Sequence, residues 1–525
     1  MTAPVAPANP GMVTLTIEGR TVIVPPGTNL IEAAKTAGVL IPHYCYHPSL
    51  PVAGVCRMCL VEVEKFPKLT PACATTVGEG QVVHVHSEKA REARKGVLEF
   101  LLINHPLDCP ICDQAGECEL QDYTFAEGRK DSRYMEPKRF NPMEDFGGDV
   151  LYVPNRCILC TRCVRFMDVV ATDPVLNVSE RGDRAYIGKF EGSDLTHAWA
   201  GNVVDLCPVG ALLSKDFLNK ARAWELDRAA SICPGCSQGC NVMLETRDNV
   251  VVRIRPRPNA AVNQHFACDV GRLNYRWINR RDRLEYPQVR SAQGLTTASW
   301  SEAMGVAATA IRDASRVTII ASPSLSNETL FLLSRIATHL QANAVMTVPR
   351  GAEAPLPGVK DLALRAERAA NATGAALLGF TDVISPAAGL GVNDLVIIAD
   401  DAAALATIPA GVRIIVIGTT LDASLASGVV AALPVCNFAE EDGSFTNLRG
   451  RVQRFLQGKA PPAQVRPSYA VVSDLAGTLG AGSFPSLASD VFATLATAVP
   501  AFAGLSYRAL GLQGGPAALA VEASV

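Results

Sequence analysis

The stretch HYCYHPSLPVAGVCRMCLVEV, residues 43–63, sets the pattern for the first half of this 525-residue chain. It places Cys45 well ahead of a tight pair, Cys56 and Cys59, and Cys73 follows after the next apolar segment. A loop around a two-iron cluster needs such a set: one distant ligand, one CxxC pair and one ligand beyond the next strand. A zinc knuckle is the alternative, but zinc sites favour two CxxC pairs. The spacing therefore predicts a 2Fe–2S site on these four cysteines.

Fifteen of the sixteen cysteines lie in four such groups between Cys45 and Cys268. Thiolates around iron support one-electron chemistry that side chains alone cannot perform. The CxxC spacings are too tight for a disulfide framework, and free thiolates indicate a reducing compartment, so we expect a cytoplasmic location. Four sites in one stretch predict an electron relay.

The second group lies in HPLDCPICDQAGECELQD, residues 105–122. Its three cysteines, Cys109, Cys112 and Cys118, are one ligand short of a four-iron cluster. His105 opens the same loop, and we predict that it is the fourth ligand of a 4Fe–4S site. The alternative is a surface or core histidine without metal. A neutral imidazole in place of a thiolate would alter the reduction potential of the cluster.

The third group combines Cys157, Cys160 and Cys163 with a distant Cys207-Pro208. Bacterial ferredoxins carry C-x2-C-x2-C-x3-C-P, and here a 43-residue insertion has moved the Cys-Pro ligand away. This group predicts a second 4Fe–4S site.

The fourth group is Cys233, Cys236, Cys240 and Cys268, where zinc is the strongest competitor. The x3 step and the neighbouring groups favour a third 4Fe–4S cluster. Cys436 stands alone, and we expect it to be a small buried hydrophobe.

Apolar periodicity predicts the elements between these groups. We expect a disordered stretch at residues 1–12, a hairpin from Val13, a helix from Asn29, strands at 60–64 and 82–87, and an amphipathic helix over 88–104. Beyond residue 285 the pattern becomes that of a parallel sheet buried on both faces. Its predicted elements are strands at 316–322, 344–348, 394–400 and 412–418, a helix at 327–342 and an Ala-rich helix at 361–378. The apolar tail, residues 485–525, should dock on this chain or on a partner.

Four motifs carry a family resemblance: HYCYHPSLPVAGVCRMC, HPLDCPICDQAGECELQD, RCILCTRCVRF and DLCPVGAL. Together, over about residues 13–285, they resemble the large iron–sulfur subunit of respiratory complex I, the family of the G subunit of NADH–quinone oxidoreductase. The rest resembles, more weakly, the molybdopterin oxidoreductase superfamily, through GSFTNLRGRVQRF at residues 443–455.

The resemblance implies a multidomain α+β and α/β fold. The expected parts are a β-grasp 2Fe–2S ferredoxin domain (13–88), a 4Fe–4S module with one histidine and three cysteine ligands (89–128), a 4Fe–4S ferredoxin-like domain (145–225), a 4Fe–4S domain of the molybdenum/tungsten-enzyme type (226–285) and a truncated molybdopterin-oxidoreductase-like α/β region (286–525).

The function implied is relay of single electrons from a flavin subunit toward quinone in NADH–quinone oxidoreductase, with proton translocation coupled elsewhere. FMN and NADH would lie on a partner subunit, and no catalytic or other cofactor-binding residue is expected here. The partners implied are the flavin/NADH-binding subunit and the quinone-proximal iron–sulfur subunits. The location implied is peripheral, on the cytoplasmic face of the bacterial inner membrane.

Two departures argue against molybdenum. Val270 stands where related formate dehydrogenases carry a lysine after the last cluster cysteine, and Arg449 replaces a glutamate of the later segment. The α/β half is also short for a complete molybdopterin enzyme. The competing functions are the iron–sulfur module of an NAD-linked formate dehydrogenase or hydrogenase, and a zinc-built assembly scaffold.

Composition excludes other classes. The net charge of −3 argues against nucleic-acid binding. The sequence contains no run of about 18 apolar residues, so we expect no membrane span. We see no basic and apolar segment of a secretory signal at the start of the sequence.

Overall fold

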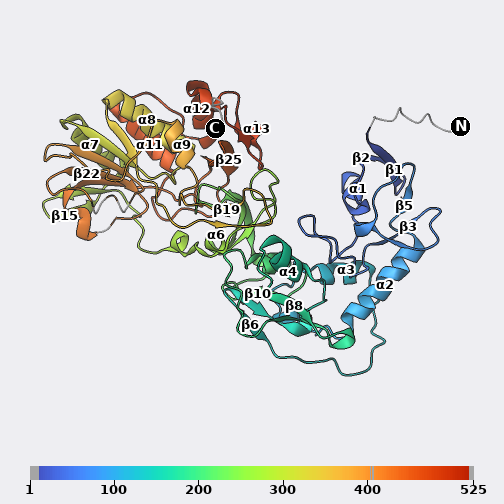
Figure 1. Ribbon diagram of the computed structural model, residues 1–525. Helices are drawn as coiled ribbons and strands as arrows, with labels where there is room; N and C mark the ends of the chain where they lie inside the picture. Colours follow the sequence, from blue (N-terminus) through green and yellow to red (C-terminus); the bar gives the residue numbers. More distant parts are fainter. Residues whose placement is uncertain (1–10, 402–403, 405–406, 422, 519–525) are drawn as a thin grey trace. The chain divides into compact units, whose positions relative to one another are not determined.

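The computed structural model describes residues 11–401, 404, 407–421 and 423–518. Most of the predicted disordered start, residues 1–10, lies outside this part. The chain divides into two compact units, one reaching to Glu225 and including residues 356–360, the other formed by the remainder. Figure 1 shows the elements of each unit, which we describe separately.

The N-terminal unit begins with a five-stranded mixed sheet. Its strand order is β2 (Arg20–Val24), β1 (Val13–Ile17), β5 (Val82–His84), β3 (Leu60–Val63) and β4 (Thr70–Pro71). The predicted hairpin is β1–β2, and β5 pairs parallel with β1. Helix α1 (Leu30–Thr36) packs its apolar face on this sheet, and the Asn29 side chain caps its first turn. The predicted small mixed sheet is confirmed.

A long helix and short strands complete this unit. Helix α2 (Glu88–Leu102) is the predicted amphipathic helix, capped by Ser87, and it leads into the loop of the second cysteine group. The further elements are α3 (Glu119–Glu127), the sheet β10 (Leu212–Ser214), β7 (Val150–Tyr152) and β6 (Glu144–Gly147), the hairpin β8 (Leu176–Ser179) and β9 (Tyr186–Lys189), α4 (Arg162–Arg165) and α5 (Asn202–Leu206). Helix α4 continues into a π-helical turn, Phe166–Val170. Such turns are frequent at functional sites.

The C-terminal unit opens with an antiparallel sheet that carries the fourth cysteine group. Its strands are β11 (Asp227–Ile232), β12 (Asn241–Arg247) and β13 (Val250–Pro256), followed by the short helix α6 (Asp269–Leu273).

The larger sheet of this unit has eight strands. Their order is β15 (Gly294–Thr297), β14 (Gln288–Ser291), β23 (Val429–Pro434), β22 (Arg413–Gly418), β21 (Leu395–Ala399), β16 (Val317–Ala321), β17 (Asn343–Met346) and β20 (Thr381–Asp382). From β23 to β20 the strands run parallel, as the apolar runs predicted, and β14 and β15 add an antiparallel edge.

The central strands β16, β21, β22 and β23 are buried on both faces, since successive side chains of a strand point in opposite directions and nearly all of them are buried here. Ile319 and Ile397 face a core that they share with the helices, whereas Ile320 and Ile398 face a second core around Leu284. The main helices are α7 (Trp300–Arg312), α8 (Asn327–Leu340), α11 (Ser468–Leu479) and α12 (Ala488–Ala498). The shorter elements are α9 (Ala372–Leu377), α13 (Tyr507–Leu510), β18 (Ala354–Pro355), β19 (Ala363–Leu364), β24 (Gly443–Thr446), β25 (Arg451–Phe455) and β26 (Gly515–Pro516).

Two expectations for this half meet different outcomes. The apolar tail docks on its own chain, because Phe492, Phe502 and Tyr507 belong to the main core.

The prediction of an Ala-rich helix over 361–378 is wrong except for α9, because tertiary contacts override helix propensity in its first half. Asp361 has a positive φ of 61°, and the carbonyl of Glu367 accepts a hydrogen bond from the backbone N–H of Ser237.

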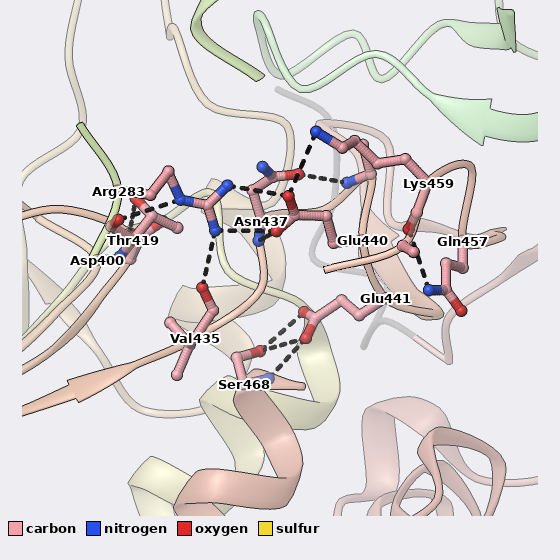
Figure 2. Close-up of polar contacts among 12 residues, drawn as sticks. Arg283, Asp400, Thr419, Val435, Asn437, Glu440, Glu441, Gln457, Lys459 and Ser468 are labelled. Carbon is pink, nitrogen blue, oxygen red and sulfur yellow. Dashed lines mark hydrogen bonds and ion pairs between the residues drawn. The ribbon is translucent and has the colours of Figure 1, made fainter. Parts of the chain in front are cut away.

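A buried polar centre ties the segment after the fourth cysteine group to the ends of the parallel strands (Figure 2). The Arg283 guanidinium binds both carboxylate oxygens of Glu440 at 2.9 Å, with side chains 4% and 0% exposed. It also donates to the carbonyls of Thr419 and Val435, which follow strands β22 and β23. Lys459 adds a second cation, 3.7 Å from Glu440. One carboxylate therefore balances two buried cations.

The neighbouring carboxyl, Glu441, lies in a different environment. It accepts hydrogen bonds from the backbone and hydroxyl of Ser468, at 2.6 and 2.8 Å, and pairs with no cation among the described residues (Figure 2). Burial raises the pKa of Glu441 to about 8, so this side chain is mostly protonated at neutral pH.

The substitution Glu440→Gln should destabilise the C-terminal unit by about 3–5 kcal/mol, because it leaves the buried Arg283 guanidinium without its ion-pair partner. The matched control is Glu441→Gln, which replaces a mostly neutral carboxyl and should have a much smaller effect at pH 7. Hydrogen exchange of peptides from β21, β22 and β23, resolved by mass spectrometry, measures both. Equal protection in the two variants would contradict the assigned role of the ion pair.

Candidate metal centres

The four cysteines of the third group line one cavity. Cys157, Cys160, Cys163 and Cys207 line this small cavity of about 20 Å³ together with apolar side chains such as Ile187. Burial raises the pKa of Cys157 and Cys207 to about 11 and that of Cys160 to about 12. Four thiols around one apolar space, two of them on buried and two on half-buried residues, form a donor set that fits a metal cluster, whose positive charge would stabilise the thiolates.

The backbone of this loop turns its amides toward sulfur. Leu159 and Thr161 adopt left-handed conformations, with φ of 53° and 58°, which non-glycine residues rarely do. The Leu159 N–H donates to the Cys157 Sγ at 3.4 Å. Backbone strain of this kind persists where the surroundings enforce it, often at functional sites. The strained loop here directs an N–H donor at the Cys157 sulfur.

The structure also brings the four thiols of the first group together. The Cys45 thiol interacts with those of Cys56 and Cys73, and the Cys59 thiol interacts with that of Cys73. The Cys45 N–H also donates to the Cys56 Sγ at 3.4 Å. The hydrogen bond from Cys56 is the main cause that lowers the pKa of Cys45. The structure thus brings together the four residues that the sequence spacing grouped.

In the second group the three thiols act on one another electrostatically. His105 is influenced instead by neighbouring charged side chains. The charges of Cys112 and Cys109 both raise the pKa of Cys118, in addition to burial. His105 is half-buried, and its Nδ1 is shielded from solvent and finds no hydrogen-bond partner among the described residues. Burial, followed by the charges of Lys138 and Arg156, lowers the pKa of His105 to about 4. A neutral imidazole with an unpaired nitrogen fits the role of a metal ligand.

The fourth group is assembled at the start of β12 and α6. All four cysteines are buried, and the Cys233 N–H donates to the Cys240 carbonyl at 2.8 Å. Gly271 lies so close that a side chain there would approach the Cys233 Sγ to 2.9 Å. Burial is the main cause that raises the pKa of Cys268 to about 11, with the charge of Cys236 adding to it.

The superfamily-like segment near residue 450 holds the loop of this fourth group. The Leu448 N–H donates to the Ser237 carbonyl at 2.9 Å, and the Gln453 amide donates to the Gly239 carbonyl at 2.8 Å. The Asn447 side chain donates to the Gln238 carbonyl at 3.3 Å. The fourth cysteine group and this segment, far apart in sequence, therefore form one structure.

A single-ion site is not preformed. Across the described parts of the chain, no three His, Cys, Asp or Glu side chains stand close enough together to hold one metal ion. A tetrahedral zinc site gathers four ligands about 2.0–2.3 Å from one metal. All sixteen cysteines are free of disulfides.

Sequence reasoning missed the arginines that connect the groups. One nitrogen of Arg165, Nη2, donates to the carbonyl of Cys45 at 2.6 Å and to that of Cys160 at 3.1 Å. This side chain joins the ligand loops of the first and third groups. Its position in RCILCTRCVRF, two residues after Cys163, was the available signal.

The second and third groups are also in contact. A side chain at Gly210, three residues after Cys207, would come within 2.2 Å of the Cys112 Sγ. The Glu119 N–H, next to Cys118, donates to the Pro208 carbonyl at 3.1 Å. The third group therefore contacts each of the other two.

Fold and donor sets together define a multidomain iron–sulfur protein, and segments of the chain match four protein families. Residues 11–88 match "2Fe-2S iron-sulfur cluster binding domain", and residues 94–133 match "NADH-ubiquinone oxidoreductase-G iron-sulfur binding region". Residues 147–213 match "NADH-quinone oxidoreductase subunit 3, ferredoxin-like domain", and residues 227–280 match "Molybdopterin oxidoreductase Fe4S4 domain". These matches confirm the predicted fold class.

Curated relatives point in the same direction. The chain is 40% identical over 334 residues to the G subunit of NADH-quinone oxidoreductase from Rickettsia bellii. The aligned region covers 63% of this chain and 49% of that protein. It is 44% identical over 300 residues to the mitochondrial NADH-ubiquinone oxidoreductase 78 kDa subunit of Candida albicans, 57% of this chain and 42% of that protein. The chain spans about half the length of these relatives. The predicted resemblance to the family of the complex I G subunit is confirmed.

A solved structure is similar to part of the chain. One chain of an NAD+-reducing NiFe-hydrogenase in the H2-reduced state aligns with 40% of this chain and 90% of its own length, at 30% identity. Its TM-score of 0.37 is too low to show a common fold. Among the helices that the structure describes, none is long and apolar enough to cross a membrane.

The assignment of His105 leads to a prediction. His105→Cys should retain a four-iron cluster but change its reduction potential, because an anionic ligand replaces a neutral one. His105→Ala should make that cluster labile. Redox titration followed by EPR spectroscopy measures both effects. A wild-type spectrum and midpoint in both variants would show that His105 is not a ligand.

Proposed function

We propose that this chain is the electron-relay subunit of an NADH–quinone oxidoreductase, passing single electrons from a flavin subunit toward quinone. Proton translocation would be coupled elsewhere in the complex. The observation that carries the proposal is the packing of three ligand groups side by side in the N-terminal unit, through Arg165 and Gly210. An electron carrier needs closely spaced centres, because electron transfer between them weakens steeply with distance.

The proposed cofactors are one 2Fe–2S cluster and three 4Fe–4S clusters, which when bound would supply the one-electron chemistry. The protein residues hold them, set their potentials and exclude water. The proposed ligands are Cys45, Cys56, Cys59 and Cys73; His105, Cys109, Cys112 and Cys118; Cys157, Cys160, Cys163 and Cys207; and Cys233, Cys236, Cys240 and Cys268.

The contacts support one order of transfer within the N-terminal unit. The third group touches the first through Arg165 and the second through Gly210, so electrons would pass from the first group to the third and then to the second. Cys109, in the second group, is exposed, which suits an exit toward another protein. The linear sequence, in which the second group precedes the third, gives no hint of this order.

The proposed partners are the flavin/NADH-binding subunit, which would hold FMN, and the iron–sulfur subunits nearer to quinone. The proposed location is the peripheral arm on the cytoplasmic face of the bacterial inner membrane. Both rest on the similarity to complex I proteins, whose names state their complex. The predicted domain boundaries, from 13–88 to 286–525, are part of this proposal.

The α/β half is proposed to be a scaffold without molybdenum. In doubly wound sheets, ligands bind beyond the carboxyl ends of the strands, where the strand order reverses. Here the order reverses between β16 and β21, and α8 begins beyond β16. The buried Glu328 at this helix start accepts hydrogen bonds from Ser444 at 2.7 Å and Tyr507 at 2.8 Å. Hydrogen bonds within the chain thus already satisfy the carboxyl at this helix start.

Metal analysis tests this proposal directly. Anaerobically purified, fully reconstituted protein should contain about fourteen iron atoms per chain, the content of one two-iron and three four-iron clusters. It should contain neither molybdenum nor tungsten, and dithionite reduction should produce EPR signals of both cluster types. A colourless protein with stoichiometric zinc would contradict the relay, whereas a plateau near ten irons with one zinc would remove only the fourth group.

The fourth group is proposed to stabilise structure rather than to carry electrons. It fastens β11 and β12 to the segment around Gln453, where a metal would hold a small sheet with little core of its own.

Cys236→Ala should therefore lower the assembly or thermal stability of the complex. Assembled Cys236→Ala complex should still transfer electrons from NADH to quinone at nearly the normal rate per flavin. The control is Cys160→Ala in the third group, which should abolish transfer. If assembled Cys236→Ala complex is as inactive as this control, the fourth group lies on the electron path.

A further inference from the structure

Arg165 occupies a special place between two of the cysteine groups. Its Nη2 donates to the carbonyls of Cys45 and Cys160, one ligand residue from each of the first and third groups. Its Nη1 donates to the carbonyl of Pro51, in the same loop as Cys45. Its Nε donates back to Thr161, at 3.2 Å. A single guanidinium therefore fixes two ligand loops that lie more than a hundred residues apart in sequence.

Arg162, one helical turn earlier on α4, makes a parallel connection. Its guanidinium donates to the Tyr46 carbonyl at 2.7 Å and to the Leu206 carbonyl at 3.1 Å. Tyr46 follows Cys45, and Leu206 precedes Cys207. The side chain is buried, and Glu119 lies 3.6 Å away. Residues three apart on a helix lie on one face, so the CTRCVR spacing places both arginines toward the first group.

The chemistry of the contacts requires arginine. A guanidinium offers five N–H donors in a rigid fork and stays protonated in proteins, whereas a lysine ammonium is a flexible point charge. Arg162 binds carbonyls of the two loops with two different nitrogens, Nη1 and Nη2. Arg165 binds carbonyls of both loops with the two hydrogens of Nη2. No lysine could reproduce this geometry.

The charge of Arg165 also lacks a carboxylate partner. Among the residues that the structure describes, no Asp or Glu forms an ion pair with it, and the negative groups that act on it are Cys45, Cys160 and Cys163. Its half-buried position weakens the screening of its charge by water. A positive charge near two centres favours the form of each that carries one more electron.

We propose that Arg165, supported by Arg162, is a positioning residue for electron transfer between the first and third groups, and that its charge raises the reduction potentials of both. This inference rests on the proposed relay function. The step moves one electron from the first centre to the third. No bond is made or broken, and no proton is transferred, because the guanidinium stays protonated throughout.

The test compares Arg165→Met and Arg165→Lys in the assembled complex. Arg165→Met removes the positive charge and the fork of N–H donors. Both midpoint potentials should therefore fall by about 59 mV, which corresponds to about a tenfold change in a one-electron equilibrium constant. It should also slow transfer between the two centres at least tenfold, measured by freeze-quench EPR after mixing with NADH. Arg165→Lys keeps the charge, so its potentials should stay nearer to wild type while transfer remains slow.

The matched control is Arg222→Met. Arg222 also donates to backbone carbonyls beside a cysteine group, those of Cys112 and Pro110, and within the described residues it bonds to neither the first nor the third group. Its removal should leave the potentials of those two groups unchanged. A purely mechanical role for Arg165 would also leave them unchanged in Arg165→Met. A second readout without redox chemistry is hydrogen exchange of residues 45–52, which should increase in both Arg165 variants.

The outcomes separate this inference from the proposed function. If wild-type complex shows no EPR signal from either group, the relay itself is wrong. If both signals are present and Arg165→Met changes neither midpoint, the inference about charge is overturned. Should Arg165→Met fail to assemble, the Arg165→Lys complex decides: a wild-type transfer rate between its two centres would overturn the positioning role.

Discussion

The N-terminal unit depends on compensation of negative charge in its interior. Its cysteines are mostly buried, and burial raises the pKa values of those in the third group well above that of a free thiol. Thiolates can persist there only with positive charge or N–H donors close by. The protein supplies amide donors from a strained loop and guanidinium groups on the walls of the sites. The proposed clusters would supply the remaining positive charge.

This constraint explains why Arg165 binds carbonyls rather than carboxylates. A carboxylate beside Arg165 would cancel the charge that the thiolates require, and its own burial would be unfavourable. Carbonyl oxygens satisfy the N–H groups without adding net charge. The same contacts fix the loops of the first and third groups to one another, so electrostatics and geometry are served by one side chain.

The C-terminal unit follows the opposite rule at its polar centre, since the buried charges there are paired within the protein. Arg283 and Lys459 meet Glu440, and Glu441 is mostly neutral. This closed polar centre joins the strand ends of the large sheet to the segment that follows the fourth cysteine group. A unit built in this way is suited to a supporting role.

The sequence alone determined how the cysteines are grouped, because a CxxC pair places two thiols in one loop whatever the rest of the chain does. It also determined the hairpin at Val13 and the buried parallel strands such as 395–399, whose period and apolar runs leave few alternatives. It failed over 361–371, where alanines favour a helix but contacts with Ser237 impose an irregular path. Only the tertiary structure decided that the third group contacts both the first and the second, and that Arg162 and Arg165 join the first group to the third. Such contacts connect residues far apart in sequence, and no local pattern records which carbonyl a guanidinium will reach.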